Sequence, residues 1–321
     1  MRLLLIRHGE TLDNVVGNWA GTQDSALTTH GVIQTTRLGA HLASNGVKVS
    51  HIFSSDLQRA SRTAQAIGAA QDPPPPHVKL ESIREQDFGW WEGKTITKGA
   101  KNEQRLKHCL DEGFRDIESK ESMKARAKDF ISTHLMQHLH DREDDETVAV
   151  VAHGIILSYL WRTLLKRFDA KNVTVGPTVI LGDRGVEYMG GWSNTGYLDL
   201  EVKRVASSVS KVEADTAKLL LPVADNLKDI ASRFLPTNHF VPIVASHGNA
   251  ASPRAADIGT GSISSPVAAS AKSSPLLLVV KSVNNLEHLR GLKKTRGGIG
   301  SSRHDDKQTA VDSFFKRQKT K

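Results

Sequence analysis

Features that mark secreted and membrane proteins are scarce in this sequence of 321 residues. It contains one cysteine, Cys109, so no internal disulfide can form, and a cytoplasmic or nuclear location is expected. No apolar stretch approaches the roughly 20 residues that a membrane helix needs. The apolar start over 1–6 is too short for a secretory signal and meets Arg7 at once, which favours a buried first strand. We therefore expect a soluble protein without a membrane partner.

Net charge is also scarce, except at one end of the chain. The formal net charge is +8, and residues 281–321 hold eleven Lys or Arg and four Asp or Glu, which leaves +7 there and +1 elsewhere. A basic tail on a nearly neutral body favours docking to an acidic partner, such as nucleic acid, an import receptor or an acidic protein surface. A tail that only improves solubility is the alternative. No segment resembles a base-reading module, which argues against direct nucleic-acid binding.

Residues 1–205 alternate short β-rich runs with longer segments of helical periodicity. The predicted strands cover residues 3–6, 49–53, 78–80, 148–152 and 197–202. The predicted helices cover residues 29–44, 57–69, 121–139 and 155–166. This order predicts an α/β fold, a three-layer α/β/α sandwich around a doubly wound, mostly parallel sheet. Because ligands in such sheets lie beyond the carboxyl ends of the strands, we expect His8 and His153 to share one crevice.

The composition changes after residue 205. Residues 206–274 are rich in Ala, Ser and Pro without regular periodicity, which predicts a largely disordered insertion with at most a marginal helix over 212–235. The next run is too apolar for solvent, so 275–290 is predicted to return to the sheet as a strand and to end the domain. Residues 291–321 are predicted to form a flexible basic tail.

The first strand leads into residues suited to phosphate chemistry. Hydrolysis of a phosphate ester needs a nucleophile, positive groups around the phosphoryl oxygens and an acid for the leaving oxygen. A neutral His8 with one ring nitrogen anchored as a donor presents the lone pair of the other nitrogen. Arg7 and Arg59 can offer guanidinium groups to phosphate, while Thr11 and Asn14 supply short polar side chains.

Two later segments supply the remaining groups. Glu85 lies near the aromatic, Gly-containing run 88–93, and apolar walls there are expected to keep its carboxyl group protonated as the acid. Residues 150–154 repeat the pattern of strand, His and Gly that surrounds His8. His153 is therefore expected to donate to the phosphoryl oxygens as charge develops.

Together these four segments resemble the histidine phosphatase superfamily, also called the phosphoglycerate mutase-like fold. The resemblance covers residues 1–202 and resumes at 276–289. It implies that His8 is phosphorylated transiently, that Glu85 is the proton donor, and that neither a metal nor a cofactor takes part. The implied catalytic residues are His8, Glu85, Arg7, Arg59 and His153, and the implied substrate-binding residues are Arg7, Thr11, Asn14, Gly21, Arg59 and Gly154.

The branch of the family is a finer question. Residues 88–93 resemble the phosphatase branch, and the basic, Pro-containing insertions of the glycolytic mutases are not evident. We therefore expect a phosphomonoester hydrolase acting on a small phosphorylated substrate or a phosphoprotein. A phosphoglycerate mutase and a catalytically idle interaction scaffold are the alternatives.

Residues 94–147 are predicted to form a helical cap that selects the substrate. Four cations in it suit either a second anionic group or, more simply, a solvated helix face: Lys94, Lys98, Lys101 and Arg105. Further along, His134 and His138 share a helix face near His140 and invite a metal interpretation. Because no carboxylate or cysteine pattern accompanies them, we interpret them as a polar helix face and expect no metal site.

The last fourteen residues place two adjacent aromatics in a polar, basic tail. Residues 308–315 resemble the peptide motif that binds the DNA sliding clamp, proliferating cell nuclear antigen. One helical turn would place Val311, Phe314 and Phe315 on one face as an apolar plug, while Gln308 reaches a separate polar pocket. The alternative is that the two aromatics fold back onto the enzyme's own surface.

Overall fold

The computed structural model describes residues 1–95, 107–140, 146–177, 179–182, 184–204, 276–293 and 299–304. By its internal contacts the chain divides into one unit of 1–205 with 275–321, described below, and a second unit of 206–274. The predicted disordered insertion and the clamp-binding residues Gln308, Val311, Phe314 and Phe315 lie outside the described residues. Both therefore stay predictions.

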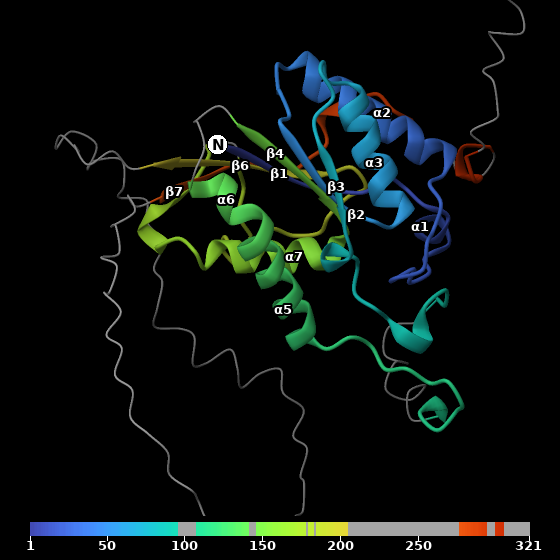
Figure 1. The fold of residues 1–321 in the computed structure, drawn as a ribbon. Helices are drawn as coiled ribbons and strands as arrows, with labels where there is room; N and C mark the ends of the chain where they lie inside the picture. The colour runs from blue at the N-terminus through green and yellow to red at the C-terminus, as the bar shows by residue number, and fades with distance from the viewer. Residues whose placement is uncertain are drawn as a thin grey trace, which may run out of the picture. The chain divides into compact units, whose positions relative to one another are not determined.

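A mixed sheet forms the centre of the first unit, with the strand order β3-β2-β4-β1-β6-β7-β5 (Figure 1). The strands are β1 (Arg2–Arg7), β2 (His51–Ser55), β3 (His77–Leu80), β4 (Thr147–Ala152), β5 (Val173–Val175), β6 (Tyr197–Arg204) and β7 (Leu276–Asn285). The pairs β2–β3, β2–β4, β1–β4 and β5–β7 are parallel, whereas β6 is antiparallel to β1 and β7. The predicted α/β class with a mostly parallel sheet is confirmed.

Helices cover both faces of this sheet (Figure 1). They are α1 (Leu12–Val16), α2 (Thr29–Ser44), α3 (Gln58–Ala69), α5 (Lys120–Phe130), α6 (Met136–His140) and α7 (Gly154–Leu165). A π-helical turn, Ile131–Leu135, joins α5 to α6. Helices α2 and α3 lie on one face, and α5, α6 and α7 lie on the other. No helix within the described ranges is both long and apolar enough to cross a membrane.

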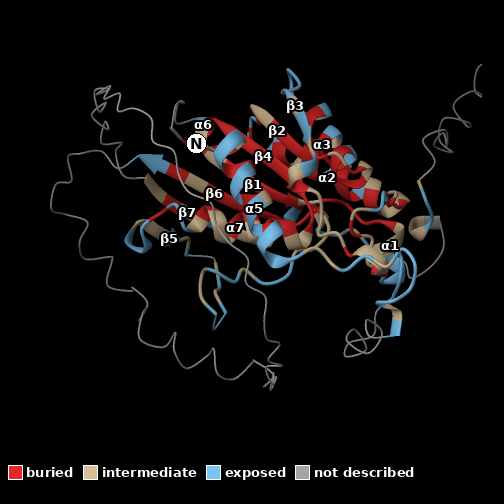
Figure 2. Cartoon of the chain, turned by 60° about the horizontal axis from the view of Figure 1, so that its bottom comes forward, coloured by how far each residue is buried: buried red, intermediate tan, exposed pale blue. Residues whose placement is uncertain are grey.

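Alternate residues of β1 belong to two separate cores. Leu3 and Leu5 pack with the face that α5 and α7 cover, whereas Leu4 and Ile6 pack with α2 and α3. This is the period of two that a strand imposes, and both sets are buried because each face carries a helical layer. Figure 2 shows the central strands as largely buried and the outer helix surfaces as exposed.

The bounds of the longer elements follow their sequence patterns closely. Helix α2 has the predicted bounds, α3 begins one residue later than predicted, and α7 begins and ends one residue earlier than predicted. Helix α1 and strand β5 were not predicted. Their five and three residues are too few to show a period.

The prediction that residues 94–147 form a helical cap is wrong for the part of the segment that forms α5. Met123, Ala127 and Phe130 of α5 are fully buried in the same core as β1 and β4, and α5 packs along α7. The helical part of the segment therefore completes the second layer of the sandwich, because its apolar stripe is buried against the sheet. Residues 96–106 of the predicted cap lie outside the described residues.

Candidate active site

The sheet brings two histidines together at one edge. Strands β1 and β4 are parallel neighbours with Arg7 opposite Ala152, so His8 and His153 leave the sheet side by side. Their ring centroids are 5.0 Å apart, and both side chains are buried. Both line a cavity of about 360 Å³ that also receives Arg7, Arg59 and Glu85.

The environment of His8 settles its protonation and its tautomer. Nδ1 lies 2.7 Å from the carbonyl oxygen of Gly9, which can only accept, so Nδ1 carries the hydrogen and Nε2 keeps its lone pair. Burial lowers the pKa of His8 well below its usual range, and the charges of Arg59 and Arg7 lower it further. His8 is therefore a neutral imidazole whose acceptor nitrogen is available to an electrophile.

Gly9 allows this turn to pack closely. A Cβ atom at Gly9 would lie 2.9 Å from the carbonyl oxygen of Gly31 and 2.7 Å from the side chain of Thr35. The Gly9 N–H donates to the hydroxyl of Thr63 at 3.1 Å. The carbonyl that orients His8 is thus held by α2 and α3, two helices that the sequence places far from β1.

Arg59 connects the two sides of the cavity. Its buried guanidinium donates to the carbonyl oxygens of Gly21 and Gln23 at 2.6 and 2.7 Å, and its Nε donates to Nδ1 of His153 at 3.1 Å. Three of its five N–H groups are used in this way. Gly21 lines the cavity at a positive φ of 56°, where a side chain would also collide with Glu92.

His153 is held in the opposite tautomer from His8. Because arginine can only donate, Nδ1 of His153 accepts and its Nε2 carries the hydrogen. Burial, together with the charge of Arg59, lowers the pKa of His153 well below its usual range. Within the described part of the chain, His153 Nε2 and Arg7 Nε are buried and have no hydrogen-bond partner. Two buried donors beside the lone pair of His8 are what an anionic ligand requires.

Arg7 and Asn14 are oriented by a turn that precedes β6. Arg7 Nη1 donates to the carbonyl oxygen of Trp192 at 2.6 Å. Asn14 accepts through Oδ1 from the backbone N–H of Thr11 at 3.2 Å and from the side chain of Asn194 at 2.9 Å. The amide NH₂ of Asn14, which lines the cavity, therefore remains as a donor for a ligand.

Asn194 and Thr195 are supporting residues that sequence reasoning missed. Asn194 Nδ2 also donates to the carbonyl oxygen of His8 at 3.2 Å. The Thr195 N–H approaches the carbonyl oxygens of Arg7 and His8 at 3.1 Å each, and its φ of 57° is uncommon outside glycine. His288 contacts the Thr195 hydroxyl at 2.8 Å, and burial lowers the pKa of His288 to about 4. The polar residues 193–196 predict a turn, but a predicted turn does not reveal which distant residues it contacts.

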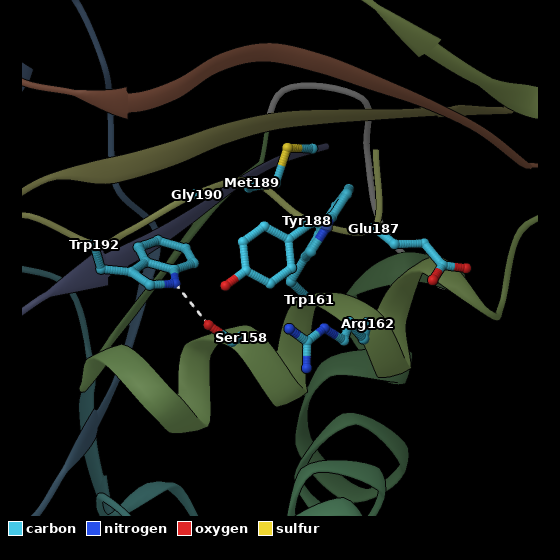
Figure 3. Close-up of a pocket in the computed structure, with 8 residues that line it drawn as sticks. All are labelled: Ser158, Trp161, Arg162, Glu187, Tyr188, Met189, Gly190 and Trp192. Atoms are coloured by element: carbon cyan, nitrogen blue, oxygen red, sulfur yellow. Dashed lines mark hydrogen bonds between the residues drawn. The ribbon is translucent and has the colours of Figure 1, made fainter. Parts of the chain in front are cut away.

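The wall behind Arg7 is fixed by Trp192, whose indole N–H donates to the hydroxyl of Ser158 on α7 at 3.0 Å (Figure 3). The hollow that Figure 3 shows beside it, between Arg162 and Tyr188, has a volume of about 40 Å³. That is room for one or two water molecules and not for a phosphate ester. Gly154 is the first residue of α7 and lies beside Arg7: a Cβ atom added at Gly154 would be 3.9 Å from Arg7 Nε. Gly154 does not line the cavity that contains His8 and His153.

Glu85 lines the cavity. The sequence predicted apolar walls around its carboxyl group, but the structure surrounds that group with backbone N–H donors. Its Oε2 accepts from the backbone N–H of Ile155 at 3.1 Å, and its Oε1 accepts from those of Ile156 and Gln86 at 3.1 and 3.0 Å. His153, the residue before α7, makes no side-chain cap, so Glu85 caps this helix instead. These three N–H donors hold the carboxyl group of Glu85 in place at the start of α7.

The outer part of the cavity is aromatic. The rings of Trp19 and Phe88 lie with centroids 4.5 Å apart, and both residues line the cavity. Among the described lining residues, Arg7 and Arg59 are the only cations. Lys94 does not point into the cavity; its Nζ lies 2.8 Å from the ring centroid of Trp90. Lys98, Lys101 and Arg105 lie outside the described residues.

Fold and cavity together define an α/β protein whose cavity is lined by a neutral histidine, a second histidine and two arginines. The chain matches the histidine phosphatase superfamily (branch 1) over residues 3–175, more than half of its length. It therefore belongs to the histidine phosphatase superfamily.

Individual relatives carry different names. A probable phosphatase of Schizosaccharomyces pombe is 28% identical over 215 residues, which cover 66% of this chain and 69% of the relative. A probable phosphoglycerate mutase of Salmonella paratyphi B is 33% identical over 168 residues, which cover 51% of this chain and 75% of the relative. Among solved structures, a mycobacterial glucosyl-3-phosphoglycerate phosphatase is 25% identical, covers 63% of this chain and 92% of its own, and has a TM-score of 0.46.

Proposed function

We propose that this protein is a phosphomonoester hydrolase that works through a phosphohistidine on His8. The observation that carries the proposal is that the neighbouring imidazoles of His8 and His153 are held in opposite tautomers. His8 keeps a lone pair on Nε2, while His153 Nε2 and Arg7 Nε are buried donors without partners in the described part of the chain. A phosphoryl group beside His8 would supply acceptor oxygens to both donors and an electrophilic phosphorus to the lone pair.

Two balanced steps follow from this arrangement. In the first, His8 Nε2 attacks phosphorus, the bond to the leaving oxygen breaks, and that oxygen takes a proton from Glu85. In the second, water attacks phosphorus, the bond to His8 breaks, and Glu85 takes the proton of the water. Glu85 lines the same cavity as His8, so its carboxyl group is placed to exchange these protons.

The cavity supports hydrolysis over mutase activity. A mutase must hold a second anionic group of its substrate, which calls for additional cations. The described lining offers Trp19 and Phe88 beyond the phosphate-facing residues and no cation besides Arg7 and Arg59. A relative named probable phosphatase is consistent with this choice, and the relatives named probable phosphoglycerate mutase keep the mutase as the second candidate.

A substrate panel separates the candidates. The purified full-length chain is expected to hydrolyse aryl and alkyl phosphates with steady turnover, with release of inorganic phosphate as the readout. It is expected to convert 3-phosphoglycerate to 2-phosphoglycerate no faster with a bisphosphorylated cofactor than without it. Cofactor-stimulated conversion that exceeds phosphate release would establish the mutase instead. Inactivity on the whole panel by correctly folded protein would favour the idle scaffold.

We propose separately, from the sequence alone, that the tail at 308–315 docks on a sliding clamp. A peptide of residues 304–321 is expected to bind the purified clamp in a calorimetric titration. Replacing Phe314 and Phe315 with alanine removes the apolar plug and is expected to abolish the signal, while Lys321→Ala, outside the motif, leaves it intact. Equal affinity of the double variant would exclude this docking mode.

A further inference from the structure

Three potential metal ligands converge at the edge of the sheet opposite the cavity. His51 is the first residue of β2, Glu146 directly precedes β4, and His138 lies on α6. Glu146 Oε1 lies 3.0 Å from Nδ1 of His51 and 3.1 Å from Nδ1 of His138. The cluster stands at the amino ends of β2 and β4, whereas His153 follows the carboxyl end of β4.

The burial of this cluster corrects the interpretation of His138 as part of a polar helix face. Its side chain is 3% exposed and that of Glu146 is 6% exposed. The ring of Phe53 packs 5.6 Å from that of His138, centroid to centroid. The carboxylate partner is Glu146, eight residues after His138 and beyond the helix. The helical pattern of 134–140 therefore did not reveal it.

The two imidazoles are arranged as ligands around one point. Their centroids are 4.7 Å apart and their planes are tilted by 52°, so the rings do not stack and both Nδ1 atoms face Glu146. The ligand atoms of the three residues all lie within 4.8 Å of one another. Two histidine nitrogens and a carboxylate oxygen from three separate elements form a donor set suited to Zn²⁺, whose fourth position a water molecule can fill.

We propose that His51, His138 and Glu146 bind a divalent transition metal, with Zn²⁺ as the best match to this donor set. Without metal, Nδ1 of His138 forms a hydrogen bond with Oε1 of Glu146 at 3.1 Å, and Nδ1 of His51 lies 3.0 Å from the same oxygen. With metal, each imidazole carries its hydrogen on Nε2, and any additional proton on the cluster is released. Gln137 lies 3.4 Å from Nε2 of His138, and a turn of its amide group lets it accept that hydrogen.

Such a metal would be structural. It would tie α6 to β2 and β4, two strands that are already paired in the sheet. The six residues of β4 place the cluster roughly 20 Å from His153, since a strand rises about 3.3 Å per residue. Metal binding should therefore change thermal stability and leave the hydrolysis of an aryl phosphate unchanged.

The test uses full-length protein stripped with a chelator and then titrated with Zn²⁺ alone. We expect one Zn²⁺ to bind per chain and the thermal midpoint to rise by several degrees. His138→Gln and Glu146→Gln are each expected to abolish both effects. His134→Gln is the matched control, because it removes an imidazole one turn earlier and leaves all three ligands in place. No rise in the midpoint of the wild type, or an equal rise in all variants, would overturn the proposal.

A second readout does not depend on how the variants fold. Co²⁺ added to the stripped wild type is expected to give the strong visible absorption of a tetrahedral site, which a stoichiometric amount of Zn²⁺ then removes. A cluster held only by protons and hydrogen bonds predicts no such spectrum. Absorption that persists in His138→Gln would place the metal elsewhere and contradict the assignment.

Discussion

His8→Ala is expected to lower kcat for aryl phosphate hydrolysis by roughly 10³- to 10⁶-fold, the range found when a covalent nucleophile is removed. The lone pair of Nε2 has no substitute, because the Gly9 carbonyl orients this one ring and the nearby His153 presents a hydrogen instead. The measurements are steady-state turnover and quenched labelling with a radioactive phosphate ester. The wild type should carry an acid-labile, alkali-stable label, and the variant should carry none.

His153→Ala is the informative companion variant. It removes a donor to the phosphoryl group and keeps the nucleophile, so a smaller loss of roughly 10²- to 10³-fold is expected, with labelling of His8 retained. A His8→Ala protein that still turns over at the wild-type rate, or that still takes up the acid-labile label, would refute the phosphohistidine route.

The lowered pKa of His8 also predicts the pH profile. An ordinary histidine gains a proton as the pH falls through about 6.5 and would lose its nucleophilic lone pair. Burial and the charges of Arg59 and Arg7 lower the pKa of His8, so it stays neutral through that window. After correction for the phosphate of the substrate, whose second pKa is about 6, kcat/KM should not fall between pH 7 and pH 6.

Glu85→Gln is expected to lower kcat by roughly 10²- to 10⁴-fold on an alkyl phosphate and far less on a nitrophenyl phosphate. An alkoxide needs a proton in order to leave, whereas nitrophenolate leaves unaided. Stopped assays of both esters with the same enzyme preparation give the ratio of the two losses. That ratio separates proton donation from simple loss of structure, which would affect both substrates equally.

The structural role of Glu85 calls for a control. Because its carboxylate caps the N–H groups of Ile155 and Ile156, the amide of the variant loses one of these contacts. Asn45→Ala removes the side-chain hydrogen bond to the carbonyl oxygen of His41 at the C-terminal end of α2 and provides a variant weakened at a helix end away from the cavity. Equal losses on the two esters in Glu85→Gln, matched by Asn45→Ala, would show that Glu85 acts only as a cap.

Sequence patterns predicted the parts of the fold that depend on local order. The alternation of β1 and the apolar stripe of α2 report burial directly, because side chains repeat every two residues in a strand and about every 3.6 in a helix. The placement of His8 and His153 at the ends of parallel strands followed from the same reasoning. Short elements such as β5 and the supporting turn at Asn194 did not, because their structure depends on neighbours distant in the chain.

The sequence by itself determined which chemical groups are present and on which strands they end: Arg7 and His8 after β1, and His153 after β4. Only the tertiary structure decided their states. The tautomer of His153, the contacts of Glu85 with the first N–H groups of α7 and the burial of His138 beside Glu146 each depend on atoms contributed by other segments. Hydrogen bonding and desolvation act over a few ångströms in space, whatever the separation along the chain, and so they become visible only when the chain is folded.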